Sequence, residues 1–406
     1  MNHIPWHLNW QVPRFPKDEG ERRHKLVRQQ MGYRGLDCLI VAGNSANFRG
    51  YELDSRYVSG FASWFDPNYI VFPLEGDPVM FINSQGSAML AESIGFIKAK
   101  AYLRGPFGQD HVASIVATIR ELGLEKGRFG IVSMRVMSAM VYKGLLNQLR
   151  EAEFVDASDL IRQIREIKSP LELEFMRKSG ECADRGWEAM RDAARPGVRE
   201  LEIASACDRA MQNHGAESGP HLLLSSGNWK AFSGALTLSG GARVLQKGDV
   251  ILNEITPSYG GYYTQLCRPI CLGPPDDDFK RLVKIHLAMY EFARKELRPG
   301  VRYEEIETRV AELGAKVGKG RFSEKGLWAL QSCEVSDTYV CIHPTFKWQG
   351  EIKPGMCFVI HPRSQDARIR EGSPDYVRGH TIGDSFIVTR DGNECLSKLP
   401  HEITVV

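Results

Sequence analysis

The sequence predicts an α+β domain preceded by a smaller α/β domain. At 406 residues the chain exceeds the size at which one hydrophobic core stops growing, so two domains are expected. Hydrophobic residues make up 43% of the chain and charged residues 25%, as in ordinary globular proteins. In the second half of the chain, helical patterns alternate with strand patterns that favour mainly antiparallel pairing, which indicates an α+β architecture.

The first domain is expected to follow a short arm. Residues 1–20 contain three prolines and two tryptophans, which favours an extended segment. From Glu19 to Met31 the sequence follows a helical period, and the run LDCLIVAG is typical of a buried strand closed by glycine. Residues 21–158 are therefore expected to form the α/β domain. Its other elements are strands at RYVSGF, NYIVFPLEGDPVMFI and GRFGIVS, and an amphipathic helix at residues 110–123.

The strongest local signal opens the second domain, residues 159–406. Ser169 can cap a helix, Pro170 takes the first helical position, and Glu172 stands three residues after the cap. This capping box predicts a long helix from Pro170 onward. Further helices are expected at residues 200–213, 277–295 and 303–317, with strands at HLLLSS, DVILNEI, YYTQLCRPICLG, MCFVIHP and DSFIVT.

Charge and hydropathy exclude several classes of function. The 52 basic and 50 acidic side chains leave a formal net charge of +2, which gives no electrostatic footprint for nucleic acid or an anionic membrane. No run of about 18 apolar residues occurs, and the amino-terminal segment lacks the apolar core of a signal peptide. Nine cysteines without a CxxC pair match reduced thiols. We expect a cytoplasmic protein that binds neither nucleic acid nor membrane.

Five segments carry a resemblance to a known superfamily. They are RYVSGF, IREIKSPLELEFMRKSG, KGDVILNEITPSYGGYYTQLCRPICLG, EIKPGMCFVIHP and GHTIGDSFIVTRDGNECLSKLP. In this order they resemble the creatinase, prolidase and aminopeptidase superfamily, from about Arg22 to the end of the chain. The resemblance implies a C-terminal domain with the pita-bread fold and a creatinase-type N-terminal domain.

The resemblance also implies where the peptidases of this superfamily bind two metal ions. Their ligands, two Asp, one His and two Glu, fall on Glu254, Gln265, Ser336, His361 and Gly383. Glutamine and serine are weak neutral donors and glycine has no side chain, so these positions do not predict a two-metal carboxylate cluster. We therefore expect an enzyme without a metal cofactor. The alternative is a single divalent ion held by Glu254, His343 and His361.

Three titratable residues are candidates for catalysis. Glu254 stands in an otherwise apolar strand, where a carboxylate is costly to bury unless it is paired or serves a functional site. His361 takes the position of an acidic metal ligand of the family, and a neutral imidazole can act as general acid or base. His343 aligns with a histidine that binds the substrate and transition state in the peptidases. The structural alternatives are an ion pair for Glu254 and a buried core histidine for His361.

A second group of residues is expected to contact the substrate. Gln265 and Ser336 can hydrogen-bond a polar molecule without a metal ion. Cys267 lies two residues after Gln265, hence on the same face of a strand. A thiolate there would need a base such as His361, whereas a small packing residue is the plainer interpretation.

Four more candidates lie in other segments. On a regular strand His380 faces away from position 383, unless a bulge at Gly379 reverses it. Tyr263 can hydrogen-bond a substrate or serve as framework. Trp64 and Phe65 belong to the loop ASWFDPNY, and in creatinase-like dimers the matching loop reaches into the partner's site. The resemblance thus implies a homodimer whose N-terminal domain completes the site of the partner.

Together these observations predict a creatinase-like, metal-independent hydrolase. It would cleave a C–N bond in a small polar molecule of amide, ureido or amino-acid-like character. The alternatives are a lyase or decarboxylase on the same scaffold, a mononuclear metal enzyme, a relative of the Xaa-Pro peptidases and a catalytically inactive binding module. Because decay of a site would not favour titratable residues, replaced chemistry is the preferred interpretation.

Overall fold

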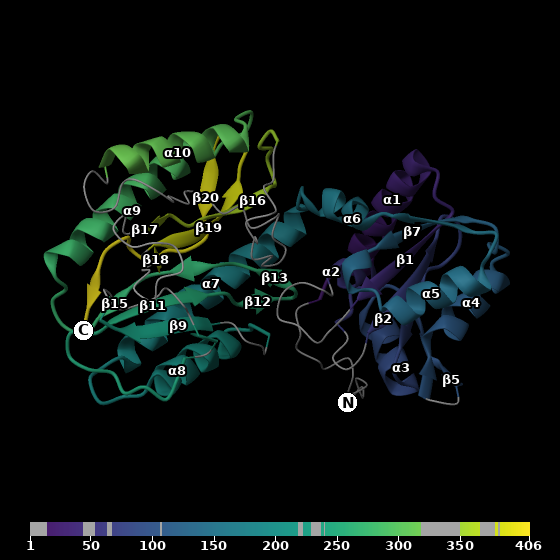
Figure 1. Ribbon diagram of the computed structural model, residues 1–406, viewed down its shortest axis with the longest axis horizontal. Coiled ribbons are helices and arrows are strands. Elements are labelled where there is room, and N and C mark those ends of the chain that lie inside the picture. Colours follow the sequence, from purple (N-terminus) through teal and green to yellow (C-terminus); the bar gives the residue numbers. More distant parts are fainter. Residues whose placement is uncertain are drawn as a thin grey trace, which may run out of the picture. The chain divides into compact units, whose positions relative to one another are not determined.

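The computed structural model divides into two units, Met1–Arg165 and Glu166–Val406, drawn in Figure 1. The smaller α/β unit precedes the larger α+β unit, which confirms the predicted fold class. No helix among the described residues is apolar over a length that would cross a bilayer. The structure describes residues 14–43, 53–62, 67–105, 108–217, 222–228, 237–238, 240–317, 350–365, 378–380 and 382–406.

The N-terminal unit is built on a six-stranded sheet with the order β4-β3-β2-β1-β7-β8. Alternate residues of the central strand β1 (Cys38–Gly43) enter two separate cores, because side chains alternate along a strand. The other strands are β2 (Asn68–Pro73), β3 (Val79–Ile82), β4 (Lys98–Ala101), β7 (Arg128–Val132) and β8 (Glu153–Asp156), with the separate pair β5 (Leu103–Gly105) and β6 (Gly108–Asp110). The helices are α1 (Lys17–Arg34), α2 (Leu53–Ser59), α3 (Gln85–Ile94), α4 (His111–Glu121), α5 (Ala139–Gln148) and α6 (Ser158–Arg165), and the 3-10 turn η2 covers Met134–Val136.

One predicted strand is wrong, because most of RYVSGF lies in helix α2. An apolar run this short has no period that separates a strand from a buried helical turn. Asp54 stands in the first turn of α2 and accepts hydrogen bonds from Ser133 and Arg165, both at 2.6 Å. A carboxylate in that position stabilises a helix start. The preceding helix α1 begins at Lys17, and residues 1–13 lie outside the described residues.

The C-terminal unit contains a nine-stranded sheet whose main path is β10-β9-β11-β14-β19-β16. Helices α7 (Pro170–Ala193) and α8 (Glu200–Asn213) pack on β9 and β11, whereas α9 (Asp277–Glu296) and α10 (Tyr303–Val317) pack on β16 and β19 (Figure 1). The strands of the path are β9 (Leu222–Gly227), β10 (Thr237–Leu238), β11 (Val250–Ile255), β14 (Leu266–Cys267), β16 (Cys357–Ile360) and β19 (Gly383–Val388). The remaining strands are β15 (Ile270–Cys271), β20 (Asn393–Cys395), β21 (Thr404–Val405), and the hairpins β12 (Ser258–Tyr259) with β13 (Tyr262–Tyr263) and β17 (Arg363–Gln365) with β18 (Arg378–His380).

The capping box at the start of α7 is confirmed in both of its hydrogen bonds. The Glu172 amide donates to Ser169 Oγ at 3.2 Å, and the Ser169 amide donates to Glu172 Oε2 at 2.6 Å. Glu172 also accepts a hydrogen bond from Tyr262 Oη at 2.8 Å, so the same side chain fixes the β12–β13 hairpin. The helix start is therefore coupled to the segment that leads into β14.

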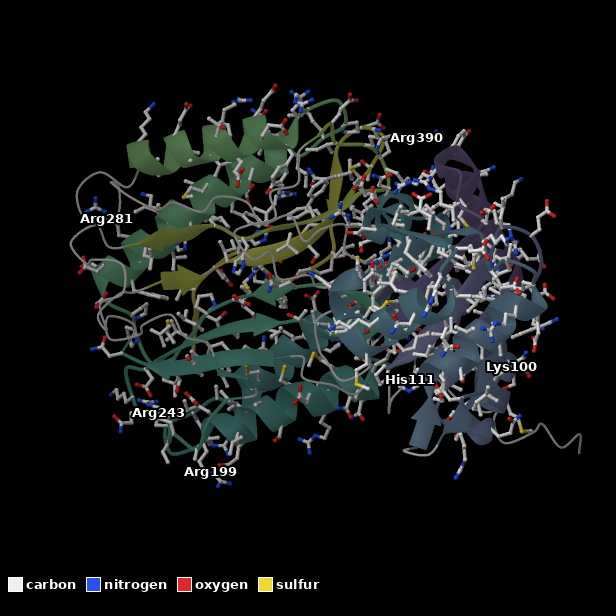
Figure 2. The ribbon with its side chains drawn as sticks, turned by 45° about the vertical axis from the view of Figure 1, so that its right-hand side comes forward. Lys100, His111, Arg199, Arg243, Arg281 and Arg390 are labelled. Atoms are coloured by element: carbon white, nitrogen blue, oxygen red, sulfur yellow. The ribbon has the colours of Figure 1, made fainter. Side chains whose placement is uncertain are left out.

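An ion pair anchors the beginning of β11. Arg243, labelled in Figure 2, donates to Asp249 through Nη1 at 2.6 Å and Nη2 at 3.0 Å. Asp249 belongs to the KGD turn that precedes the strand, and it also accepts a hydrogen bond from the Gln246 amide at 2.7 Å. The turn thus sets where β11 starts.

We expect Ser169→Ala to lower the free energy of unfolding by about 1 kcal/mol, because the first turn of α7 loses its cap. Urea titration followed by circular dichroism measures the change. Ser205→Ala is the matched control, since Ser205 is exposed within α8 and its hydroxyl donates to the Leu201 carbonyl. Equal effects of the two substitutions would contradict a specific role for the cap.

Candidate active site

The candidate site is a row of residues on one face of the larger sheet. The strand register fixes two neighbouring rows across β11, β14, β19 and β16. The first row, which faces the helices, consists of Ile255, Leu266, Asp384 and Ile360. Because successive residues of a strand face opposite sides, the next row lies on the other face. We name it the inner row, and it consists of Glu254, Cys267, Gly383 and His361.

Glu254 and Gln265 form one polar contact at the inner row. Glu254 is 3% exposed and Gln265 is 2% exposed. Gln265 Nε2 donates to Glu254 Oε2 at 3.3 Å. The other end of the amide, Gln265 Oε1, is buried and has no hydrogen-bond partner within the described part of the chain. An unpaired buried carbonyl costs about 1–3 kcal/mol, so this oxygen is suited to accept a hydrogen bond from a ligand.

Cys267 and His361 form the second polar contact. Cys267 Sγ lies 3.2 Å from His361 Nε2, and both residues are fully buried. A thiol and an imidazole at this distance can exchange a proton. Sequence reasoning named both residues, and the structure brings them together although 94 positions separate them.

Gly383 gives the thiol and the imidazole the space to meet. Its position lies between Cys267 and His361 in the inner row. A Cβ atom at Gly383 would lie 2.9 Å from His361 Cδ2 and 3.2 Å from Cys267 Sγ. Any larger residue would displace one of these side chains, so the glycine is a condition for the contact.

The helix-covered face carries a different polar network, centred on Asp384. Arg268 Nη2 donates to both carboxylate oxygens of Asp384 at 2.9 Å, Tyr290 Oη donates to Oδ2, and His401 Nε2 lies 2.9 Å from Oδ2. Burial alone would raise the pKa of Asp384, but the Arg268 charge and the hydrogen bonds with His401 and Tyr290 outweigh it and hold this pKa below its ordinary value. Asp384 is therefore a buried anion with a full set of partners.

The same network contains a group of potential metal ligands, Asp384, Cys395 and His401, whose donor atoms lie within 4.8 Å of one another. Both oxygens of Asp384 already accept from the Arg268 guanidinium. Because Asp384 is already paired with this cation and also accepts from Tyr290, we interpret the group as structural. Arg268 directly follows Cys267 in the sequence, and sequence reasoning assigned it no role.

Several contacts missed by sequence reasoning hold the segment that carries Gln265. Ser385 Oγ accepts a hydrogen bond from the backbone N–H of Gln265 at 2.8 Å. Ser179 of α7 donates to the Pro257 carbonyl at 2.9 Å and lies 3.0 Å from Thr264 Oγ1. No motif signals these serines and this threonine, because their partners are distant in sequence.

The other predicted site residues lie elsewhere or outside the described residues. Tyr263 is partly exposed in β13. His380 was predicted to share a regular strand with position 383, and this is wrong: its backbone belongs to β18, which pairs with β17 in a separate hairpin. The predicted residues outside the described part of the chain are Trp64, Phe65, Ser336 and His343. The homodimer that depends on the first two stays a prediction.

Comparisons with known proteins match both units. Residues 174–390 match the model of metallopeptidase family M24, and residues 23–167 match the creatinase/prolidase N-terminal domain. The creatinase of Bacillus sp. is 24% identical over 96% of this chain and 92% of its own length, and the ectoine hydrolase of Halomonas elongata is 25% identical over 96% and 98%. The crystal structure of X-Pro aminopeptidase from Thermotoga maritima superposes with a TM-score of 0.76 at 19% identity, over 94% of this chain and 99% of that chain.

The family match corrects one expectation. An enzyme without a metal cofactor was predicted, and the matching model describes metallopeptidases, so this prediction is wrong for the family. The described residues nevertheless do not fit a two-ion cluster. Gly383 offers no donor, and the Gln265 amide nitrogen is turned toward Glu254. The donors left at the four described ligand positions are one carboxylate, one imidazole and one amide oxygen.

We expect the purified protein to retain at most about one metal ion per chain after incubation with Mn²⁺, Co²⁺ or Zn²⁺ and dialysis, because the donor set is too small for two. Inductively coupled plasma mass spectrometry measures the ratio. A Glu254→Gln variant measured in parallel reports whether a retained ion lies at the inner row. Two tightly held metal ions per chain would contradict the conclusion that the donor set is too small for a two-ion cluster.

We expect Arg268→Leu to lower the free energy of unfolding by about 3–5 kcal/mol near neutral pH, because it leaves Asp384 buried without its counter-charge. In wild type the depressed pKa of Asp384 adds stability above the unfolded pKa, about 3.9, and this stability is lost as the pH falls. In the variant, burial raises the pKa of Asp384 instead. The difference in the free energy of unfolding between wild type and variant should therefore shrink as the pH falls. Urea titrations at several pH values measure both trends.

The matched control is Arg177→Leu, which breaks a bidentate pair with Glu394 in which both side chains are partly exposed. Its cost should stay below about 1 kcal/mol and change little with pH. An Arg268→Leu deficit that does not depend on pH would show that the destabilisation comes from lost packing.

Proposed function

Because the chain belongs to metallopeptidase family M24 and also carries a creatinase/prolidase N-terminal domain, we propose that it hydrolyses a C–N bond in a small polar substrate. The substrate class is amide, ureido or amino-acid-like. Similar proteins named Xaa-Pro dipeptidase and ectoine hydrolase support hydrolysis. The observation that carries the proposal is the inner row, in which an acid, a thiol and an imidazole are buried. The acid and the imidazole, Glu254 and His361, stand where the resemblance implies metal ligands in the peptidases.

Gln265 supports a substrate that carries an N–H group. Its Oε1 atom is buried and has no partner among the described residues, while its Nε2 atom donates to Glu254. A substrate N–H that donates to Oε1 would remove the cost of the unpaired carbonyl, whereas a substrate without such a donor would leave it in place. Primary and secondary amides, ureas that keep an N–H group and amino acids all supply this donor.

Glu254 is the proposed acid–base residue. Its Oε2 atom accepts from Gln265, so the carboxylate is held in one orientation beside the substrate position. In that place it can take a proton from the attacking water and deliver it later in the reaction. His361, at the other end of the inner row beyond Cys267 and Gly383, is the proposed donor of a proton to the leaving nitrogen. His343 and Ser336, which lie outside the described residues, keep the proposed roles of oxyanion donor and substrate ligand.

We expect Glu254→Gln to lower kcat/KM by about 10²–10⁴-fold on any substrate found in a panel of small amides, ureas and dipeptides, because the substitution keeps the shape but removes the proton acceptor. Release of the amine product measures the rate. The control is Glu202→Gln, which changes an exposed carboxylate paired with Arg199 in α8. Unchanged turnover in Glu254→Gln would remove Glu254 from the chemistry.

A further inference from the structure

We propose that Cys267 is the covalent nucleophile of this reaction and that His361 takes its proton. The proposal rests on the proposed hydrolysis and adds to it the atom that attacks the substrate. The nucleophile and its base are within hydrogen-bond reach, since Cys267 Sγ lies 3.2 Å from His361 Nε2. Without such a base a thiol at neutral pH is mostly protonated and a weak nucleophile.

Other described cysteines have surroundings that differ from those of Cys267. Cys38 donates to the Leu39 carbonyl, and Cys182 donates to the His214 carbonyl. Burial raises the pKa of Cys182 to about 11 and that of Cys271 to about 12, which keeps those thiols protonated and inert. Cys267 Sγ lies 3.2 Å from an imidazole nitrogen, a group that can take the proton of an attacking thiol.

The sheet is built so that this contact can form. Cys267 and His361 stand on β14 and at the end of β16, and β19 runs between them. The two side chains meet across β19 because its residue in the inner row is Gly383. An ordinary residue at 383 would separate them, so the contact depends on the glycine.

An unpaired acceptor marks the place of the substrate beside the thiol. Gln265 precedes Cys267 by two residues, and its buried Oε1 atom has no hydrogen-bond partner among the described residues. A substrate N–H bound to this oxygen would hold the adjoining carbonyl carbon near the strand that carries Sγ. The thiol and the acceptor thus come from the β14 segment and the imidazole from the end of β16, all within one unit.

The reaction balances with water as the co-reactant. The thiol proton moves to His361 Nε2 while Sγ forms a bond with the carbonyl carbon of the substrate. The C–N bond then breaks, and the leaving nitrogen takes the proton from His361, which leaves a thioester, or a thiocarbamate from a urea. Water attacks this carbon and gives a proton to Glu254, the S–C bond breaks, and Glu254 delivers that proton to Sγ.

The test is covalent trapping with p-nitrophenyl acetate, an activated ester that does not depend on the natural substrate. We expect a burst of p-nitrophenol and a single acetyl group on Cys267, located by peptide mass spectrometry and removed by hydroxylamine. Cys267→Ala should lose the adduct, and Cys395→Ala, which removes the partly exposed cysteine near Tyr290, should retain it. Thermal unfolding of each variant establishes that it is folded.

Two further variants test whether Cys267 and His361 react as a pair or only pack against each other. His361→Gln should slow acetylation by about 10²–10⁴-fold while leaving the thiol in place. Gly383→Ala should also slow it, because its Cβ pushes the imidazole and the thiol apart without changing either group. Acetylation at the wild-type rate in both folded variants would overturn the proposal.

The outcomes also distinguish this proposal from the hydrolase proposal. Turnover of a C–N substrate that survives Cys267→Ala would overturn the nucleophile and leave the hydrolase intact. Acetylation of Cys267 without turnover of any amide, urea or dipeptide would support the nucleophile and count against the proposed hydrolysis. Acetylation that requires prior treatment with a chelator would identify Cys267 as a metal ligand and overturn the proposal.

Discussion

The inner row depends on an ion pair that lies on the opposite face of the sheet. Arg268 binds both carboxylate oxygens of Asp384 through Nη2, and its Nη1 atom also donates to the carbonyls of Cys267 at 2.8 Å and Gly383 at 3.3 Å. These are the two residues of the inner row that β14 and β19 contribute. Because a slip of one residue would turn every side chain to the other face, the pair that locks this register also places the thiol beside the imidazole.

The glycine at position 383 removes a metal ligand and, by the same change, allows Cys267 to contact His361. A glutamate at position 383 would supply a metal donor, as the resemblance implies for the peptidases, but its Cβ could not coexist with the observed positions of Cys267 and His361. The family's two-ion cluster and the thiol–imidazole contact therefore exclude each other at this position. Gly383 therefore has two effects: it removes one metal donor, and it leaves the space in which Cys267 contacts His361.

Much of the fold could be predicted from local signals in the sequence. The pairing of strands that are distant in sequence could not. The capping box at Ser169 and the helices at 200–213 and 303–317 were predicted from the sequence, because their hydrogen bonds and periods lie within a few residues. The family resemblance, now confirmed, marked Glu254 and His361 one at a time. His361 was named as a base that a Cys267 thiolate would need, but no sequence pattern shows that the two side chains meet, since their approach follows from strand pairing. For the same reason His380 was wrongly assigned to the strand of position 383.

The two faces of these strands differ in how completely their polar groups are paired. On the helix-covered face, Asp384 is surrounded by Arg268, Tyr290 and His401, and the buried charge is compensated within the protein. On the inner face, Gln265 buries a carbonyl oxygen that has no hydrogen-bond partner in the described part of the chain. Folding alone does not explain that cost, because an apolar residue of similar size would avoid it. A bound N–H group would compensate it, so the incomplete face is the one on which a ligand completes the structure.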